Sequence, residues 1–334
     1  MEPYQTSSLK GKTLLWIGTS IPEGRDLSEK DPAKRKNYPA IVAELCGATV
    51  INAALGSSAA RASSRTNDRT LINTRPFLRS LSQTLEEKEE TIRNWRKINP
   101  TTLKPEIFPD GLSEEEAEKR VRGASFERKI LPYLDGTYPM PDLFVYDHGY
   151  NDVNFGGPAL RGDIDLVPDA AKIRAGLIAP DEYMVKNDYE NLRRFFGDLS
   201  GIPKARFEKF IASVNRYTFI GASNFLFTLI LHHNPYARIV VLGTSYPDRA
   251  ELIAAQRYLA ESWGFSFINP ALGLGWGNHL IPGTARHWKE DGVEDQVQKS
   301  IFAPDGTHPH LDTKGRAISL YARVLAEQMR NLIV

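Results

Sequence analysis

Five short runs of apolar residues recur along the chain at wide intervals. They read TLLWIG (13–18), ATVINA (48–53), DLFVYDHG (142–149), RIVVLG (238–243) and FSFINP (265–270). Runs that are apolar at consecutive positions, instead of at every second one, are typical of strands covered on both faces. The pattern therefore predicts five buried strands of a parallel sheet.

Segments between and after these runs have apolar residues at helical spacing. YPAIVAELCG (38–47) and RAELIAAQRYLAESWG (249–264) both end at a glycine, which is a common helix stop. A last helix, with Asp312 as its N-cap, is expected to bury one stripe: Ala317, Leu320, Tyr321, Val324 and Leu325. Helices that alternate with buried strands indicate an α/β fold with a parallel, doubly wound sheet.

Two stretches of the chain are too long to be simple crossovers between strands. They cover about 57–141 and 155–215 and contain strongly charged segments such as SQTLEEKEETIRNWRK. We interpret both as large helical insertions into one domain that spans residues 1–334. Because both leave from the ends of strands, they are expected to form a lid or wall beside those ends.

Charge, cysteine content and the apolar segments each limit what kind of protein this is. The 334 residues include 42 Lys and Arg against 41 Asp and Glu, so charge gives no reason to expect nucleic acid or an anionic membrane as partner. The one cysteine, Cys46, excludes an internal disulfide and is expected to be a small buried residue. The N-terminus has no apolar leader, and the most apolar stretch (217–231) is too short and polar to span a membrane. We expect a soluble chain in which 217–231 is a buried helix.

Polar residues follow the predicted strands, where ligands bind in open parallel sheets. Ser20 follows the first strand, Gly56 the second, and GYND with Asn151 the third. Near the C-terminus, DGTH with Asp305 and His308 precedes the last helix. Together these residue types are those of a nucleophilic hydrolase, in which a serine needs a base and the base needs an orienting carboxylate.

The spacing of these residues suggests their roles. Asp305 and His308 are three residues apart, so a single turn lets Asp305 hold one ring nitrogen while the other faces Ser20. The oxyanion of the tetrahedral intermediate needs donors. The backbone N–H groups of Ser20 and Gly56 and the side-chain amide of Asn151 are the candidates.

A second serine occurs in nearly the same local sequence. Ser20 lies in WIGTSIPEG (16–24) and Ser245 in VLGTSYPDR (241–249), each directly after a predicted strand. Either serine could be a turn residue or a helix N-cap, and local sequence does not separate the two.

The four blocks resemble the SGNH (GDSL-like) hydrolase superfamily. They occur in the family's order as Ser20, Gly56, GYND with Asn151, and DGTH with Asp305 and His308. The order selects Ser20 as nucleophile, because the family's serine follows the first strand. Thr19 departs from the family pattern, which usually has Asp at that position.

The resemblance implies a flavodoxin-like, three-layer α/β/α sandwich and ester hydrolysis through an acyl-serine, with no metal or organic cofactor. The expected substrate is an acylated carbohydrate, most often O-acetylated in similar proteins. Arg61, Trp276 and Trp288 are candidate substrate contacts, although each could instead have a purely structural role. The alternatives are a lipid esterase and a non-catalytic carbohydrate-binding or phage tail domain of the same fold. The sequence leaves the oligomeric state open.

Overall fold

The computed structural model describes residues 6–24, 36–56, 58–61, 79–87, 89, 123–154, 216, 219–245, 249–274 and 316–332. The chain divides into two compact units. The first comprises Met1–Gly56, Pro141–Asp147 and Arg238–Val334, and the second comprises Ser57–Met140 and His148–Ala237. The first segment of the second unit begins and ends within one residue of the predicted insertion at 57–141.

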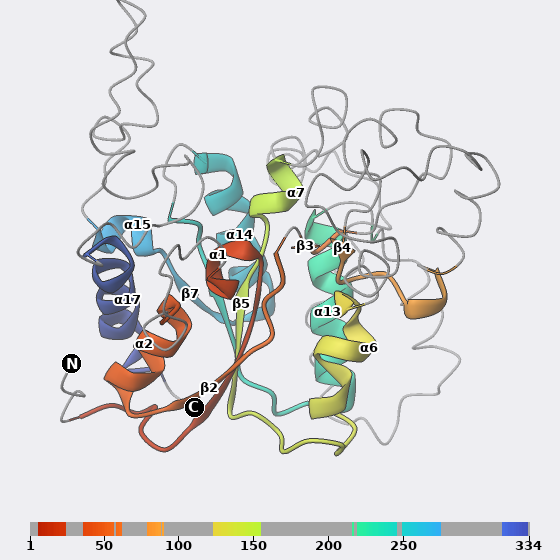
Figure 1. The fold of residues 1–334 in the computed structure, drawn as a ribbon. Helices are drawn as coiled ribbons and strands as arrows, with labels where there is room; N and C mark the ends of the chain where they lie inside the picture. Colours follow the sequence, from red (N-terminus) through yellow and green to blue (C-terminus); the bar gives the residue numbers. More distant parts are fainter. Residues whose placement is uncertain are drawn as a thin grey trace, which may run out of the picture. The chain divides into compact units, whose positions relative to one another are not determined.

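A five-stranded parallel sheet forms the centre of the first unit (Figure 1). Its strands are β1 (Thr13–Gly18), β2 (Thr49–Asn52), β5 (Leu143–Asp147), β6 (Ile239–Leu242) and β7 (Ser266–Ile268). All neighbours are parallel, in the order β2-β1-β5-β6-β7. Each strand lies within one of the five predicted apolar runs. Counted along the chain, the order is 2-1-3-4-5, the flavodoxin-like order, so the predicted fold class is confirmed.

Helices cover both faces of this sheet. Helices α2 (Tyr38–Cys46) and α17 (Arg316–Met329) lie side by side (Figure 1) and pack with Trp16, Val145 and Ile268 on one face. Phe267, which precedes Ile268 on β7, points to the other face, because the side chains of successive strand residues alternate between the two faces. There the guanidinium of Arg257, on α14 (Ala250–Trp263), lies 5.4 Å from the ring centre of Phe267.

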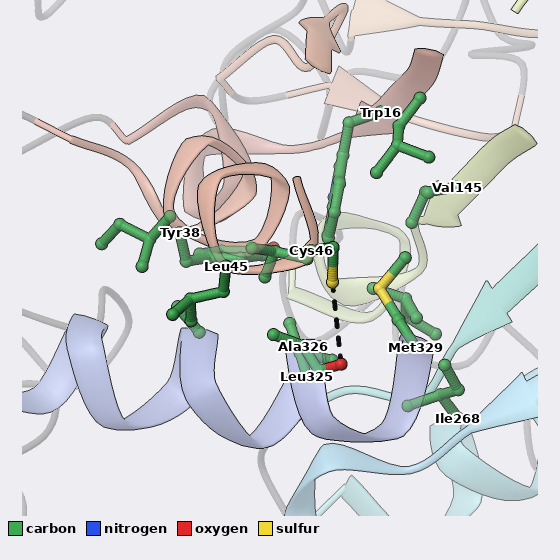
Figure 2. Close-up of a cluster of buried hydrophobic side chains, with 14 of the residues drawn as sticks. Trp16, Tyr38, Leu45, Cys46, Val145, Ile268, Leu325, Ala326 and Met329 are labelled. Carbon is green, nitrogen blue, oxygen red and sulfur yellow. Dashed lines mark hydrogen bonds between the residues drawn. The ribbon is translucent and has the colours of Figure 1, made fainter. Parts of the chain in front are cut away.

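The buried stripe of α17 differs from the predicted one. Leu320 was expected to be buried but is 51% exposed, and Val324 is only partly buried. The buried residues are Ile318, Tyr321, Ala322, Leu325, Ala326 and Met329. Alanines within the stripe allow close approach to α2, where the Cys46 thiol donates to the Ala326 carbonyl at 3.8 Å (Figure 2). Tyr321 and Leu325 are buried as predicted. The prediction was wrong for Leu320 and Val324, because it favoured large side chains where the helix contact uses alanines.

Other sequence predictions for the first unit are confirmed. Gly47 and Gly264 terminate α2 and α14 in the left-handed conformation. Cys46 is buried, and burial raises the pKa of its thiol to about 11. The predicted N-cap Asp312 lies outside the described residues.

The second unit contains a small parallel sheet and several helices. Strand β3 (Ser58–Ala59) pairs with β4 (Arg79–Ser80), and the helices are α6 (Phe126–Lys129), the 3-10 helix η3 (Leu131–Tyr133), α7 (Tyr150–Asn154) and α13 (Phe219–His233). The predicted buried helix at 217–231 is confirmed by α13, most of whose residues are buried. Sequence analysis missed β3 and β4, because two residues are too few to show a period. None of the helices in the described ranges is long and apolar enough to cross a membrane.

Candidate active site

Ser20 is the first residue of α1 (Ser20–Glu23), a single helical turn that begins directly after β1 and Thr19. Thr19 is the N-cap of this helix, and its hydroxyl accepts from the N–H of Ile21 at 3.5 Å. Thr and Asp are both good N-cap residues, so Thr19 can perform the capping that an aspartate would perform there. Since Thr19 caps the helix, capping does not explain the serine that follows. Ser20 is 6% exposed.

Gly18 allows close packing just before this turn. It pairs with Asp147 of β5 in the sheet register. A β-carbon at Gly18 would lie 2.4 Å from Cγ of Pro22 and 2.9 Å from the carbonyl oxygen of Asp147. Any larger residue would therefore displace either α1 or β5, and with α1 it would displace Ser20.

Gly56 ends a loop that is bonded to β1 through two backbone N–H groups. Ala53 N–H donates to the Trp16 carbonyl at 2.8 Å, and Leu55 N–H donates to the Gly18 carbonyl at 3.0 Å. These bonds place the loop that leads to Gly56 beside the strand that leads to Ser20. The structure thus brings two of the predicted site segments together at the carboxyl edge of β1 and β2.

Asn151 and Asp152 lie on α7 in the second unit, where both are buried and hold the segment around β3. The Asn151 amide donates to the Ser58 carbonyl at 2.8 Å. Asp152 accepts from the N–H groups of Ala60 at 3.1 Å and Arg61 at 2.9 Å. These partners are about 90 residues earlier in the chain. The Asn151 amide carries two hydrogens, so its bond to Ser58 is compatible with a second one.

Arg61 is buried beside Asp152. Burial raises the pKa of Asp152, and the bond from the Arg61 N–H and the charge of its side chain oppose that rise. The guanidinium therefore has a buried carboxylate near it. A substrate contact through Arg61 stays a prediction.

Asp147 is a partly buried carboxylate outside the predicted site. It is the last residue of β5 and accepts hydrogen bonds from the indole N–H of Trp16 at 3.1 Å and from the hydroxyl of Tyr38. Burial raises its pKa to about 6, although both hydrogen bonds act to lower it. The signal in the sequence was an acidic residue that closes an otherwise apolar strand.

Ser245 has a structural partner in the core. Its side chain hydrogen-bonds to the hydroxyl of Tyr321 on α17, and the Tyr321 ring packs edge-on against Tyr38 at 4.8 Å. Ser245 is 3% exposed. A capping role after Pro247 was one expectation for Ser245, but the N-cap of α14 is Arg249.

Each histidine in the described ranges has a pKa below the ordinary value for histidine. Burial lowers the pKa of His148 to about 3, so its imidazole is neutral near pH 7. His232 and His233 are the last two residues of α13. Burial lowers the pKa of each of these two as well.

Four predicted site residues lie outside the described residues: Asp305, His308, Trp276 and Trp288. Their roles stay predictions. In the portion of the chain that the structure describes, no group of three or more His, Cys, Asp or Glu side chains could hold a metal ion.

Comparisons with known proteins give little further information. No family model matches the chain, and no curated protein matches it in sequence. Among solved structures, the chain is similar to "a putative GDSL-like lipase" from Parabacteroides merdae ATCC 43184, with 16% sequence identity, 96% of each chain covered and a TM-score of 0.33. A TM-score this low supports no conclusion about fold or function, so the fold assignment depends on the strand order.

Proposed function

We propose that this chain is a serine esterase of the SGNH type with Ser20 as its nucleophile. The main support is the position of Ser20, which begins a helix directly after β1, a strand with neighbours on both sides. Its carboxyl end is where open parallel sheets bind ligands. Thr19 caps the helix, and Ser245, the alternative, is bonded to Tyr321. The ordered sequence blocks support the same choice.

In the proposed reaction, the Ser20 hydroxyl attacks the ester carbonyl while His308 takes its proton. Asp305 holds the histidine in the required tautomer. The N–H groups of Ser20 and Gly56 and the amide of Asn151 stabilise the oxyanion. The alcohol leaves with the proton from His308, and His308 then activates a water that releases the acid and restores Ser20.

The proposed substrate is a small acyl ester, an O-acetyl group in the first instance, on a carbohydrate. The resemblance to carbohydrate-acting SGNH proteins supports this substrate, as do Trp276 and Trp288 in the glycine-rich segment before Asp305. The strong charge of the insertion sequences argues against an apolar lid for lipid esters.

Release of p-nitrophenol from its acetate ester tests the nucleophile. The Ser20→Ala variant should lose activity by several orders of magnitude, on the order of 10⁶ in kcat where a catalytic serine has been removed elsewhere. The Ser245→Ala variant is the matched control and should keep kcat within a few fold, while it loses about 1 kcal/mol of stability with the Tyr321 bond. Full activity in Ser20→Ala would refute the assignment.

Acyl specificity tests the substrate separately. Activity should fall as the acyl chain of the p-nitrophenyl ester lengthens, and mass spectrometry should detect acetyl loss from some members of a panel of acetylated glycans. A preference for long acyl chains would favour the lipid esterase. Absence of turnover on every ester would favour a carbohydrate-binding domain.

A further inference from the structure

The side chain of Asn52, the last residue of β2, joins the two backbone segments of the proposed site in the first unit. Its Nδ2 donates to the Pro22 carbonyl of α1 at 2.7 Å, and its Oδ1 accepts from the Ala54 N–H at 3.1 Å. The amide thus links the helix that begins at Ser20 with the loop that leads to Gly56. Turning the amide over would oppose both bonds, so one orientation satisfies both partners.

The helix α1 depends on such outside partners. A helix of four residues cannot bond its own last carbonyls, which need partners from elsewhere. The carbonyls of Ser20 and Ile21 accept from Gly24 N–H, whereas the carbonyls of Pro22 and Glu23 accept from side chains. Asn37 reaches the Glu23 carbonyl at 3.4 Å, so Asn52, at 2.7 Å, makes the shorter of the two side-chain bonds.

We propose that Asn52 is a positioning residue that fixes the spacing between Ser20 and the Gly56 N–H. It acts through Pro22 and Ala54 and contacts neither the substrate nor the reacting atoms. This inference depends on the proposed function, in which the nucleophile and the oxyanion donor must be placed together. A displacement of about 1 Å in such an arrangement can lower the rate on the order of 10²-fold.

Two substitutions separate the link from the local turn. Asn52→Ala removes both bonds, whereas Asn52→Asp keeps the oxygen that accepts from Ala54 and loses the donor to Pro22. Asn269→Ala is the matched control. Asn269 directly follows β7, and, like Asn52, its Oδ1 accepts from the N–H two residues later, that of Ala271, at 3.1 Å.

With p-nitrophenyl acetate, Asn52→Ala should lower kcat by roughly 10- to 100-fold and leave KM within about twofold, because only transition-state alignment is lost. Asn52→Asp should lose a similar factor at neutral pH. Its kcat relative to wild type should then rise at acidic pH, where a protonated carboxyl can again donate to Pro22. Asn269→Ala should keep kcat within about twofold.

The outcomes distinguish this inference from the proposed function. Unchanged kcat in Asn52→Ala, alongside an inactive Ser20→Ala variant, overturns the positioning role alone. An equal loss in Asn269→Ala, or a loss confined to KM, also overturns it. A wild-type chain that hydrolyses no ester overturns both proposals. If Asn52→Ala does not fold, the pH dependence of Asn52→Asp relative to wild type decides.

Discussion

Replacing Gly18 with alanine is expected to destabilise the first unit and to displace Ser20. The new β-carbon would lie 2.4 Å from Cγ of Pro22 and 2.9 Å from the Asp147 carbonyl oxygen, against 3.4–4 Å for ordinary contact. Neither neighbour can swing aside, because one belongs to a proline ring and the other to the backbone of a central strand. Gly18 is not among the glycines with positive φ, so the backbone itself would accept alanine.

The expected cost follows from these two contacts. Overpacking of this kind costs about 1–3 kcal/mol. Alanine also lowers the conformational entropy of the unfolded chain relative to glycine, which raises the free energy of unfolding by about 0.4–1 kcal/mol. We therefore expect a net loss of about 1–2 kcal/mol in the free energy of unfolding. If the strain is relieved by moving α1, kcat should also fall roughly 10- to 100-fold, because Ser20 moves with the helix.

Urea denaturation followed by circular dichroism, together with p-nitrophenyl acetate hydrolysis, measures both effects. Gly123→Ala is the control, since a β-carbon there has no neighbour within 4 Å and φ is not positive. A second substitution, Pro22→Ala, removes the nearest atom, so the Gly18→Ala/Pro22→Ala pair should recover part of the loss. If Gly18→Ala matches wild type in stability and activity, the close packing inferred around Ser20 is wrong.

Three further predictions concern groups that are wholly or partly buried. Burial raises the pKa of Asp147 from 3.8 to about 6, so the folded state binds its proton more tightly and stability from this group is lost as pH rises through that window. The free energy of unfolding of Asp147→Asn relative to wild type should therefore increase by up to about 3 kcal/mol between pH 4 and 7, and a constant difference in urea denaturation would contradict this. Asp152→Asn leaves one of two backbone N–H groups without its acceptor and should cost about 1–3 kcal/mol, whereas Asp135→Asn, at an exposed carboxylate that accepts from Thr137, should cost less than about 0.5 kcal/mol. Burial raises the pKa of the Cys46 thiol from 9.0 to about 11, so a thiol reagent at neutral pH should react roughly 10²-fold more slowly with the folded chain than with the chain in urea.

The main sheet could be predicted from the sequence because its signal is local. Strands covered on both faces are apolar at consecutive positions, and all five predicted runs contain strands of one parallel sheet. Helix ends were equally readable, because Gly47 and Gly264 adopt the left-handed conformation that only glycine adopts readily.

What could not be predicted depends on partners distant in the chain. Asp152 bonds the N–H groups of Ala60 and Arg61 across about 90 residues, and Asp147 bonds Trp16 across 131. No local period reveals such pairs. The buried face of α17 was misjudged for a related reason, since its contact with α2 selects small residues, and the partner helix is not visible in the sequence of α17 itself.

The turns at Ser20 and Ser245 have similar local sequences but different surroundings in the structure. Both follow a parallel strand and a Gly-Thr pair, and a proline comes two residues after each serine. Their environments differ only through other parts of the chain. Gln256 of α14 accepts from the Thr244 N–H at 2.9 Å, and Tyr321 of α17 bonds Ser245, so that turn is bound to two long helices. Ser20 instead begins its own helix directly, and the Asn52 amide of β2 connects that helix to the loop that leads to Gly56. The bond to Tyr321 gives Ser245 a role in packing, whereas the nucleophilic role proposed for Ser20 needs the fixed spacing that the bonds of Asn52 supply.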